Sequence, residues 1–119
     1  MLGRIGSILA FVTALVHALV GTYDTLLPLL ASDLSLAVIG TFHACWHFVT
    51  VFLLYSAWVF WKKLKISSIL ATLWGVFGII FLVVAFYHVG ISGLLILPQW
   101  ILLGAVSALM LWEIKNSNE

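Results

Sequence analysis

Four long apolar stretches separated by short polar breaks fill most of this 119-residue chain. They cover residues 5–23, 36–61, 66–89 and 94–112. About 20 apolar residues are enough for a helix to cross the hydrocarbon core of a bilayer, so each stretch is long enough to be a span. The composition agrees, because 65% of the residues are hydrophobic and only 8% are charged. The sequence therefore predicts an integral membrane protein.

The connections between these stretches are short, at residues 24–35, 62–65 and 90–93. Consecutive helices with short connections are antiparallel neighbours, so we expect an all-α fold: an up-and-down bundle of four transmembrane helices. The bundle forms a single domain over residues 1–119. Side-chain oxygens at residues 32–35 are suited to capping the start of the second helix. Pro98 is tolerated near the start of the fourth, where its missing N–H has no partner to lose.

All five positive charges fall on one side of the predicted bundle. Arg4 precedes the first span, three lysines occupy residues 62–65, and Lys115 follows the last span. Cytoplasmic segments carry an excess of Lys and Arg, so we expect both termini in the cytoplasm and the chain in a membrane such as the bacterial inner membrane. The lysine run is interpreted as a topology signal. The expected partners are membrane lipid, further copies of the chain or a larger membrane complex, and no nucleic acid.

All four histidines lie in the opposite half of the predicted bundle. His17 belongs to the first span, His43 and His47 lie near the start of the second, and His88 lies near the end of the third. An ionisable side chain within a membrane is costly, and such residues mark functional sites. We therefore expect the function of the chain to depend on this half.

Helical spacing predicts that the histidines point into the bundle. On the first helix His17 shares its face with Gly21 and Asp24, and on the second His43 and His47 are one turn apart. Small residues on such faces allow close helix approach in lipid. We expect a pocket that opens to the extracytoplasmic side. The residues expected to line it are Asp24, His17, His43, His47, His88 and Gln99.

Imidazoles with a carboxylate are suitable ligands for a divalent transition metal such as zinc, iron or copper. The candidate metal ligands are His17, His43, His47, Asp24 and His88. The His-x-x-x-His spacing is weak by itself, because it arises often by chance and lacks the Glu of the zinc hydrolases. The expected convergence with His17 and Asp24 is what favours a metal site.

Haem b is the alternative cofactor. Bis-histidine ligation needs one imidazole from each of two facing helices at similar depth, which His17 with His43 or His47 provides. All four histidines are then candidate cofactor-binding residues, with His88 as the fourth. Gly21 and Gly40 are expected to make room for the macrocycle.

Two further functions are compatible with the sequence. Histidine and aspartate can carry protons or bind a solute, as in a transporter subunit that acts as an oligomer. Only small and apolar residues face inward below Thr13 and Thr50, which argues against a complete path in one chain. The other possibility is an accessory subunit of a larger membrane complex. The small-residue faces expected to pack the last two helices contain Gly75, Gly78 and Ala85, and Gly104, Ser107 and Ala108.

An enzymatic activity is left open, with no catalytic residue assigned. The sequence has no nucleotide-binding or hydrolase motif, and metal-assisted or redox chemistry at the outer face is compatible with Asp24 as a base. Cys45 is the only cysteine. It lies about 200° around the helix from His43, so we expect it to point away from the histidines.

Overall fold

The computed structural model describes residues 2–117, and these residues are helical apart from short turns. The elements are α1 (Leu2–Gly21), the π-helical segment η1 (Thr22–Leu26), α2 (Leu27–Leu30), α3 (Leu36–Lys62), α4 (Ser67–Val89), the 3-10 segment η2 (Gly90–Ser92), α5 (Gly93–Ile96) and α6 (Gln99–Ser117).

The prediction of an all-α membrane protein is confirmed in its broad form. Three helical stretches are long and apolar enough to cross a membrane: Leu2–Leu30, Leu36–Lys62 and Ser67–Ile96. The fourth long helix, α6, has 19 residues and is not among them. It begins with a polar residue, Gln99, and carries Glu113 and Lys115 in its last turns.

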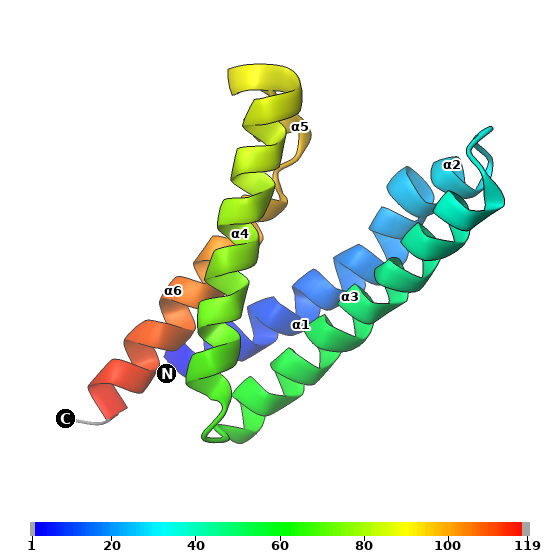
Figure 1. Cartoon of the computed structure of the whole chain (residues 1–119). Helices are drawn as coiled ribbons and strands as arrows, with labels where there is room; N and C mark the ends of the chain where they lie inside the picture. The colour runs from blue at the N-terminus through cyan, green and yellow to red at the C-terminus, as the bar shows by residue number, and fades with distance from the viewer. Residues whose placement is uncertain (1, 118–119) are drawn as a thin grey trace.

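The four long helices form two hairpins (Figure 1). α3 packs along α1, α6 packs along α4, and α1 also contacts α6. The hairpins meet near the turn at residues 63–66, where the chain passes from α3 to α4, and diverge away from it. We call the end near this turn the lysine end and the opposite end the histidine end. The arrangement therefore differs from the closed four-helix bundle that the short connections predicted.

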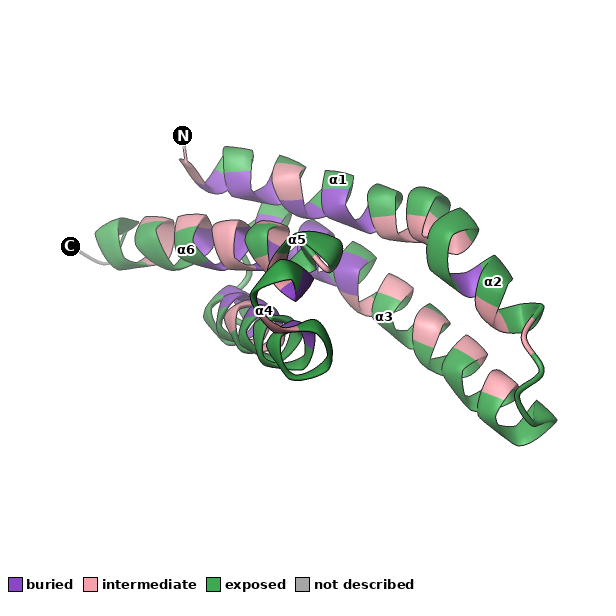
Figure 2. Ribbon diagram, turned by 90° about the horizontal axis from the view of Figure 1, so that it is seen from above, coloured by how far each residue is buried: buried purple, intermediate pink, exposed green. Residues whose placement is uncertain are grey.

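The apolar core lies toward the lysine end (Figure 2). Trp74 and Phe60 are its largest fully buried side chains, and the Phe52 ring packs against Trp74 and Phe77 across the two hairpins. By contrast, only 6% of the most apolar stretch of α3 is buried. The helices are thus held together mainly where the hairpins converge.

Small residues set the close approach of α4 and α6, as the sequence predicted. A Cβ atom added at Gly75 would lie 2.8 Å from Ser107 Oγ. One added at Gly78 would lie 3.4 Å from the backbone nitrogen of Gly104. Without side chains at these two positions the helix backbones approach closely and gain van der Waals contact, which drives helix association in lipid.

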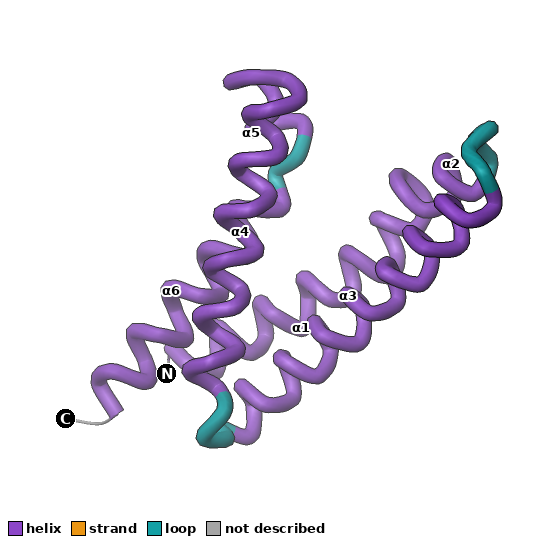
Figure 3. The backbone as a smooth tube through the Cα atoms, in the orientation of Figure 1, coloured by secondary structure: helices purple, strands orange, loops and turns teal. Residues whose placement is uncertain are grey.

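The first connection is shorter than predicted (Figure 3). Helical structure continues through η1 and α2, so only residues 31–35 form the turn before α3. Pro28 lies in the first turn of α2, where proline is compatible with a helix. The Ser35 side chain accepts a hydrogen bond of 3.4 Å from the backbone N–H of Val38, which confirms the predicted N-cap.

The helix of the predicted fourth span, residues 94–112, is interrupted near its start. The chain is helical over α5 but leaves the helix at Leu97, with φ −117° and ψ 71°, and α6 begins only at Gln99. The ring of Pro98 disfavours helical geometry in the residue before it, which accounts for this break.

Candidate functional site

His17 lies at the contact between α1 and α3. Its half-buried ring stacks on the indole of Trp46, with ring centroids 4.1 Å apart and planes 22° from parallel. Nε2 of His17 donates a hydrogen bond of 3.3 Å to the carbonyl oxygen of Trp46. This fixes the tautomer in which Nδ1 keeps its lone pair. The prediction that His17 points toward a neighbouring helix is confirmed.

Gly21 provides the space for this stack. A Cβ atom at Gly21 would lie 2.9 Å from the edge of the Trp46 indole, so any side chain there would push the indole out of its position. Trp46 therefore fills the space that the sequence interpretation assigned to a macrocycle. Its role was missed because a tryptophan in a membrane helix usually indicates the interface. The sequence signal for Trp46 was its position three residues after His43, which places it close to the histidine face of the same helix.

His43 and His47 form a pair on successive turns of α3, with ring centroids 4.9 Å apart. His43 is half-buried beside α1, whereas His47 is exposed. His47 is nevertheless close enough to His17 on α1 for the two rings to interact electrostatically, so it lies at the edge of the α1 and α3 contact, and its inward orientation stays a prediction. The face of α3 that packs on α1 contains Trp46, and the next residue is turned about 100° away from it.

Asp24 does not extend the histidine cluster. It lies in the π-helical segment η1 and its side chain is exposed. The π-helical turn contains an extra residue, so the seven-residue spacing from His17 no longer places Asp24 directly above the ring. The predicted shared face depended on uninterrupted α-helical geometry, which ends at Gly21.

His88 and Gln99 belong to the other hairpin. His88 is exposed at the histidine end of α4, where its ring contacts Tyr87 edge to face at 5.1 Å. Gln99 is the exposed first residue of α6. The two hairpins diverge toward this end (Figure 1), so the structure does not gather these residues with His17, His43 and His47. The single pocket predicted from the sequence is not formed.

Within residues 2–117 no group of three or more His, Cys, Asp or Glu side chains is placed to hold a metal ion. The full ligand set is therefore not assembled in one copy of the chain, and metal or haem binding stays a prediction. Toward the histidine end, the α1 and α3 seam contains one histidine pair and a third histidine stacked on Trp46. We call His17, His43, Trp46 and His47 the histidine seam. Cys45 is exposed on α3.

An ion pair lies at the lysine end. Lys63 Nζ is 3.2 Å from Glu113 Oε1, which joins the turn after α3 to the end of α6. The hydrogen bond from Lys63, followed by one from the backbone of Gly3, holds the pKa of the Glu113 carboxyl below its ordinary value. The sequence interpretation placed the cations at one end but did not identify this carboxylate as their partner.

Comparison with protein-family models, curated proteins and solved structures gives no match to this chain. Its function is therefore inferred from the residues and the geometry described above.

Proposed function

We propose that this chain is a four-span membrane protein that binds a transition-metal ion at the histidine seam. The observation that carries the proposal is the pair of imidazoles of His43 and His47, with ring centroids 4.9 Å apart on successive turns, and His17 on α1 hydrogen-bonded to the carbonyl of Trp46, the residue before His47. Imidazole nitrogen is a ligand for zinc, iron and copper alike.

The surroundings of His17 support a role as a ligand. Metal-binding histidines almost always donate their other ring N–H to a carbonyl or carboxylate, which orients the ring. The hydrogen bond from His17 Nε2 to the Trp46 carbonyl is of this kind and leaves Nδ1 for a metal ion. The stack on Trp46 further restricts the ring.

A bare ion is favoured over haem b between α1 and α3. The Trp46 indole occupies the space beside Gly21, and a macrocycle there would have to displace it. A metal ion needs no such space. Its remaining coordination positions are available to water, a small ligand or an adjacent protein, as in metal sites with an open position.

The proposed topology places both termini in the cytoplasm, with α6 as the fourth span. It is supported by the location of Arg4, the 62–65 lysines and Lys115 at the lysine end. The histidine seam is then on the extracytoplasmic half. Thiol labelling of intact cells tests this, because a cysteine introduced at Asp33 should react with an impermeant reagent while one introduced at Asn116 should not.

The metal proposal is tested by titrating the detergent-purified chain with Zn²⁺, Cu²⁺ and Fe²⁺, with elemental analysis and a visible spectrum of the protein as purified. His47→Ala should weaken metal binding by about ten-fold or more, because it removes one imidazole of the pair. A Soret band in the purified protein would instead favour the haem alternative.

Two matched variants control for indirect effects. Cys45→Ala changes an exposed residue on the same turn of α3, and His88→Ala removes an imidazole from the other hairpin. Both should keep the affinity of the wild type. Equal metal content in the wild type and in the triple variant His17→Ala, His43→Ala, His47→Ala would refute the proposal.

A further inference from the structure

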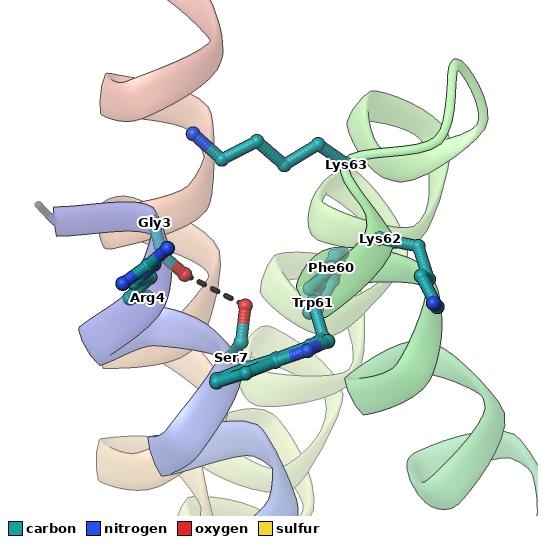
Figure 4. Close-up of a pocket in the computed structure, with 7 residues that line it drawn as sticks. All are labelled: Gly3, Arg4, Ser7, Phe60, Trp61, Lys62 and Lys63. Atoms are coloured by element: carbon teal, nitrogen blue, oxygen red, sulfur yellow. Dashed lines mark hydrogen bonds between the residues drawn. The ribbon is translucent and has the colours of Figure 1, made fainter.

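A polar cavity of about 260 Å³ opens at the lysine end, between the start of α1 and the end of α3. Three cationic residues line it, and Figure 4 shows that the Lys62 side chain is turned away from Arg4 and Ser7. Arg4 lies on α1, while Lys62 and Lys63 lie at the end of α3. The complete lining is Gly3, Arg4, Ser7, Phe60, Trp61, Lys62 and Lys63.

The positive charge at this cavity is only partly balanced. Lys63 reaches across the cavity toward α6, where it pairs with Glu113. Within the described residues, no ion pair to a carboxylate is formed by Arg4 or Lys62. The Ser7 hydroxyl donates to the Gly3 carbonyl oxygen at 2.7 Å, so Arg4 is the main donor on the α1 side.

A second cavity, of about 310 Å³, borders the first along the same seam, and the Trp61 ring reaches across to Ser7 where they meet (Figure 4). The two share Ser7 and Trp61. The second cavity is almost wholly apolar, and its other lining residues are Ile8, Phe11, Leu54, Ala57 and Trp58. Phe11 is seven residues beyond Arg4, which corresponds to about 10 Å along the helix. Together the cavities form a groove with a basic mouth and an apolar body.

We propose that this groove binds an anionic phospholipid, with the phosphate at Arg4 and one acyl chain along the apolar body. Polarity changes along the groove in the same order as along a lipid, from charged headgroup to hydrocarbon. Basic pockets between membrane helices on the cytoplasmic side are known to bind anionic headgroups, and guanidinium groups match phosphate oxygens in pairs. Trp61 lies where the two parts meet, at the depth where indole rings prefer the interface.

Arg4 thus has a second role beside topology. A free phosphate would use only the basic mouth. A zwitterionic lipid has the phosphate and the acyl chains but also brings a headgroup cation next to Arg4 and the lysines, so it should bind less strongly than an anionic lipid. The proposed occupant uses both, which gives each part a separate test.

The test uses the full chain in phosphatidylcholine vesicles that contain phosphatidylglycerol with brominated acyl chains, which quench tryptophan fluorescence on contact. Trp58 and Trp61 line the groove, so quenching reports its occupancy. We expect phosphatidylglycerol to bind more strongly than brominated phosphatidylcholine, and Arg4→Gln to reduce that preference by about five-fold, the effect of one cation near a membrane surface. Lys65→Gln, at the same end but outside the cavity, is the matched control and should keep the preference.

Three further measurements locate the lipid. Leu54→Phe narrows the apolar body without changing the charge and should weaken binding of phosphatidylglycerol. Replacing both Trp58 and Trp61 by Phe should remove the additional quenching by phosphatidylglycerol relative to phosphatidylcholine. Millimolar glycerol phosphate should not compete, because it lacks an acyl chain. Three results would overturn the assignment. They are equal binding of the two lipids by the wild type, an equal loss of lipid preference in Arg4→Gln and Lys65→Gln, and displacement of the lipid by glycerol phosphate.

Discussion

The lysine end and the histidine end of the molecule differ in how tightly their helices pack. Near the lysine end, Trp74 and Phe60 are fully buried where the hairpins meet, and Gly75 and Gly78 allow α4 and α6 to pack closely within one hairpin. Toward the histidine end the hairpins diverge, and α3 is exposed along most of its length. Lipid chains are as apolar as leucine, so hydrophobicity alone does not bring membrane helices together. Close side-chain packing therefore holds the helices together at the lysine end, and the histidine seam lies where such packing is sparse.

The largest expected difference between the two ends comes from removing one large aromatic side chain at each. Trp74→Ala leaves a cavity in the core and should lower the free energy of unfolding by about 3 kcal/mol or more. Phe48→Ala, at a side chain 71% exposed on α3, should lower it by less than about 0.5 kcal/mol. Unfolding by SDS in mixed micelles measures both. Similar losses of unfolding free energy in the two variants would contradict the difference in packing.

Glycine substitutions should give the next largest difference. Gly78→Leu forces a side chain against the backbone of α6 and should lower the free energy of unfolding by about 1–3 kcal/mol. Gly40→Leu is the matched control on α3, because a Cβ atom there meets nothing within 4 Å. It should be close to neutral in the same titration. A destabilised Gly40→Leu variant would mean that another helix or another copy of the chain packs on α3 at Gly40.

A smaller effect is expected at the histidine seam itself. Gly21→Leu displaces the Trp46 indole and breaks its stack on His17, an interaction worth about 0.5–1.5 kcal/mol. The imidazole proton signals of His17 in NMR spectra, shifted by the ring current of the indole, should move toward values for a free histidine. Unchanged signals would show that Trp46 does not stack there.

The smallest expected effect is the pH dependence of the ion pair at the lysine end. The pKa of Glu113 is lowered in the folded protein, so its contribution to stability is present at neutral pH. That contribution is lost as the pH falls below about 4.3, the ordinary value of a glutamate, and through the lower folded value. Glu113→Gln should therefore reduce the acid sensitivity of the melting temperature slightly. An unchanged pH profile would show that the pair contributes no measurable stability.

Properties that depend on a single helix could be predicted from the sequence. The apolar runs gave the long helices, residues 32–35 were expected to supply a helix cap, and the small residues of α4 and α6 were assigned to packing. Each depends on local spacing, which the amino-acid order contains directly. The limits of the helices were less accurate, because η1 and α2 continue the first helix and Pro98 delays the last.

Properties that depend on what lies beside a helix, another helix or lipid, could not be predicted in the same way. Periodicity gives the face on which His47 lies, but not whether a helix or lipid covers that face. The short connections indicated neighbours for all four helices, yet they do not require the two hairpins to close at the end that carries His88. The groove beside Arg4 and Trp61 depends on the register between α1 and α3, which no local pattern specifies.

The divergence of the hairpins is tested most directly by the distance between spin labels on α3 and α4 in lipid vesicles. One pair labels Cys45 and Tyr87→Cys at the histidine end, and a reference pair labels Tyr55→Cys and Val76→Cys beside the Phe52–Phe77 contact, with Cys45 replaced by Ser. The account predicts a much longer distance for the first pair than for the reference. Equal, short distances, as in a bundle with helix axes about 8–10 Å apart, would contradict it.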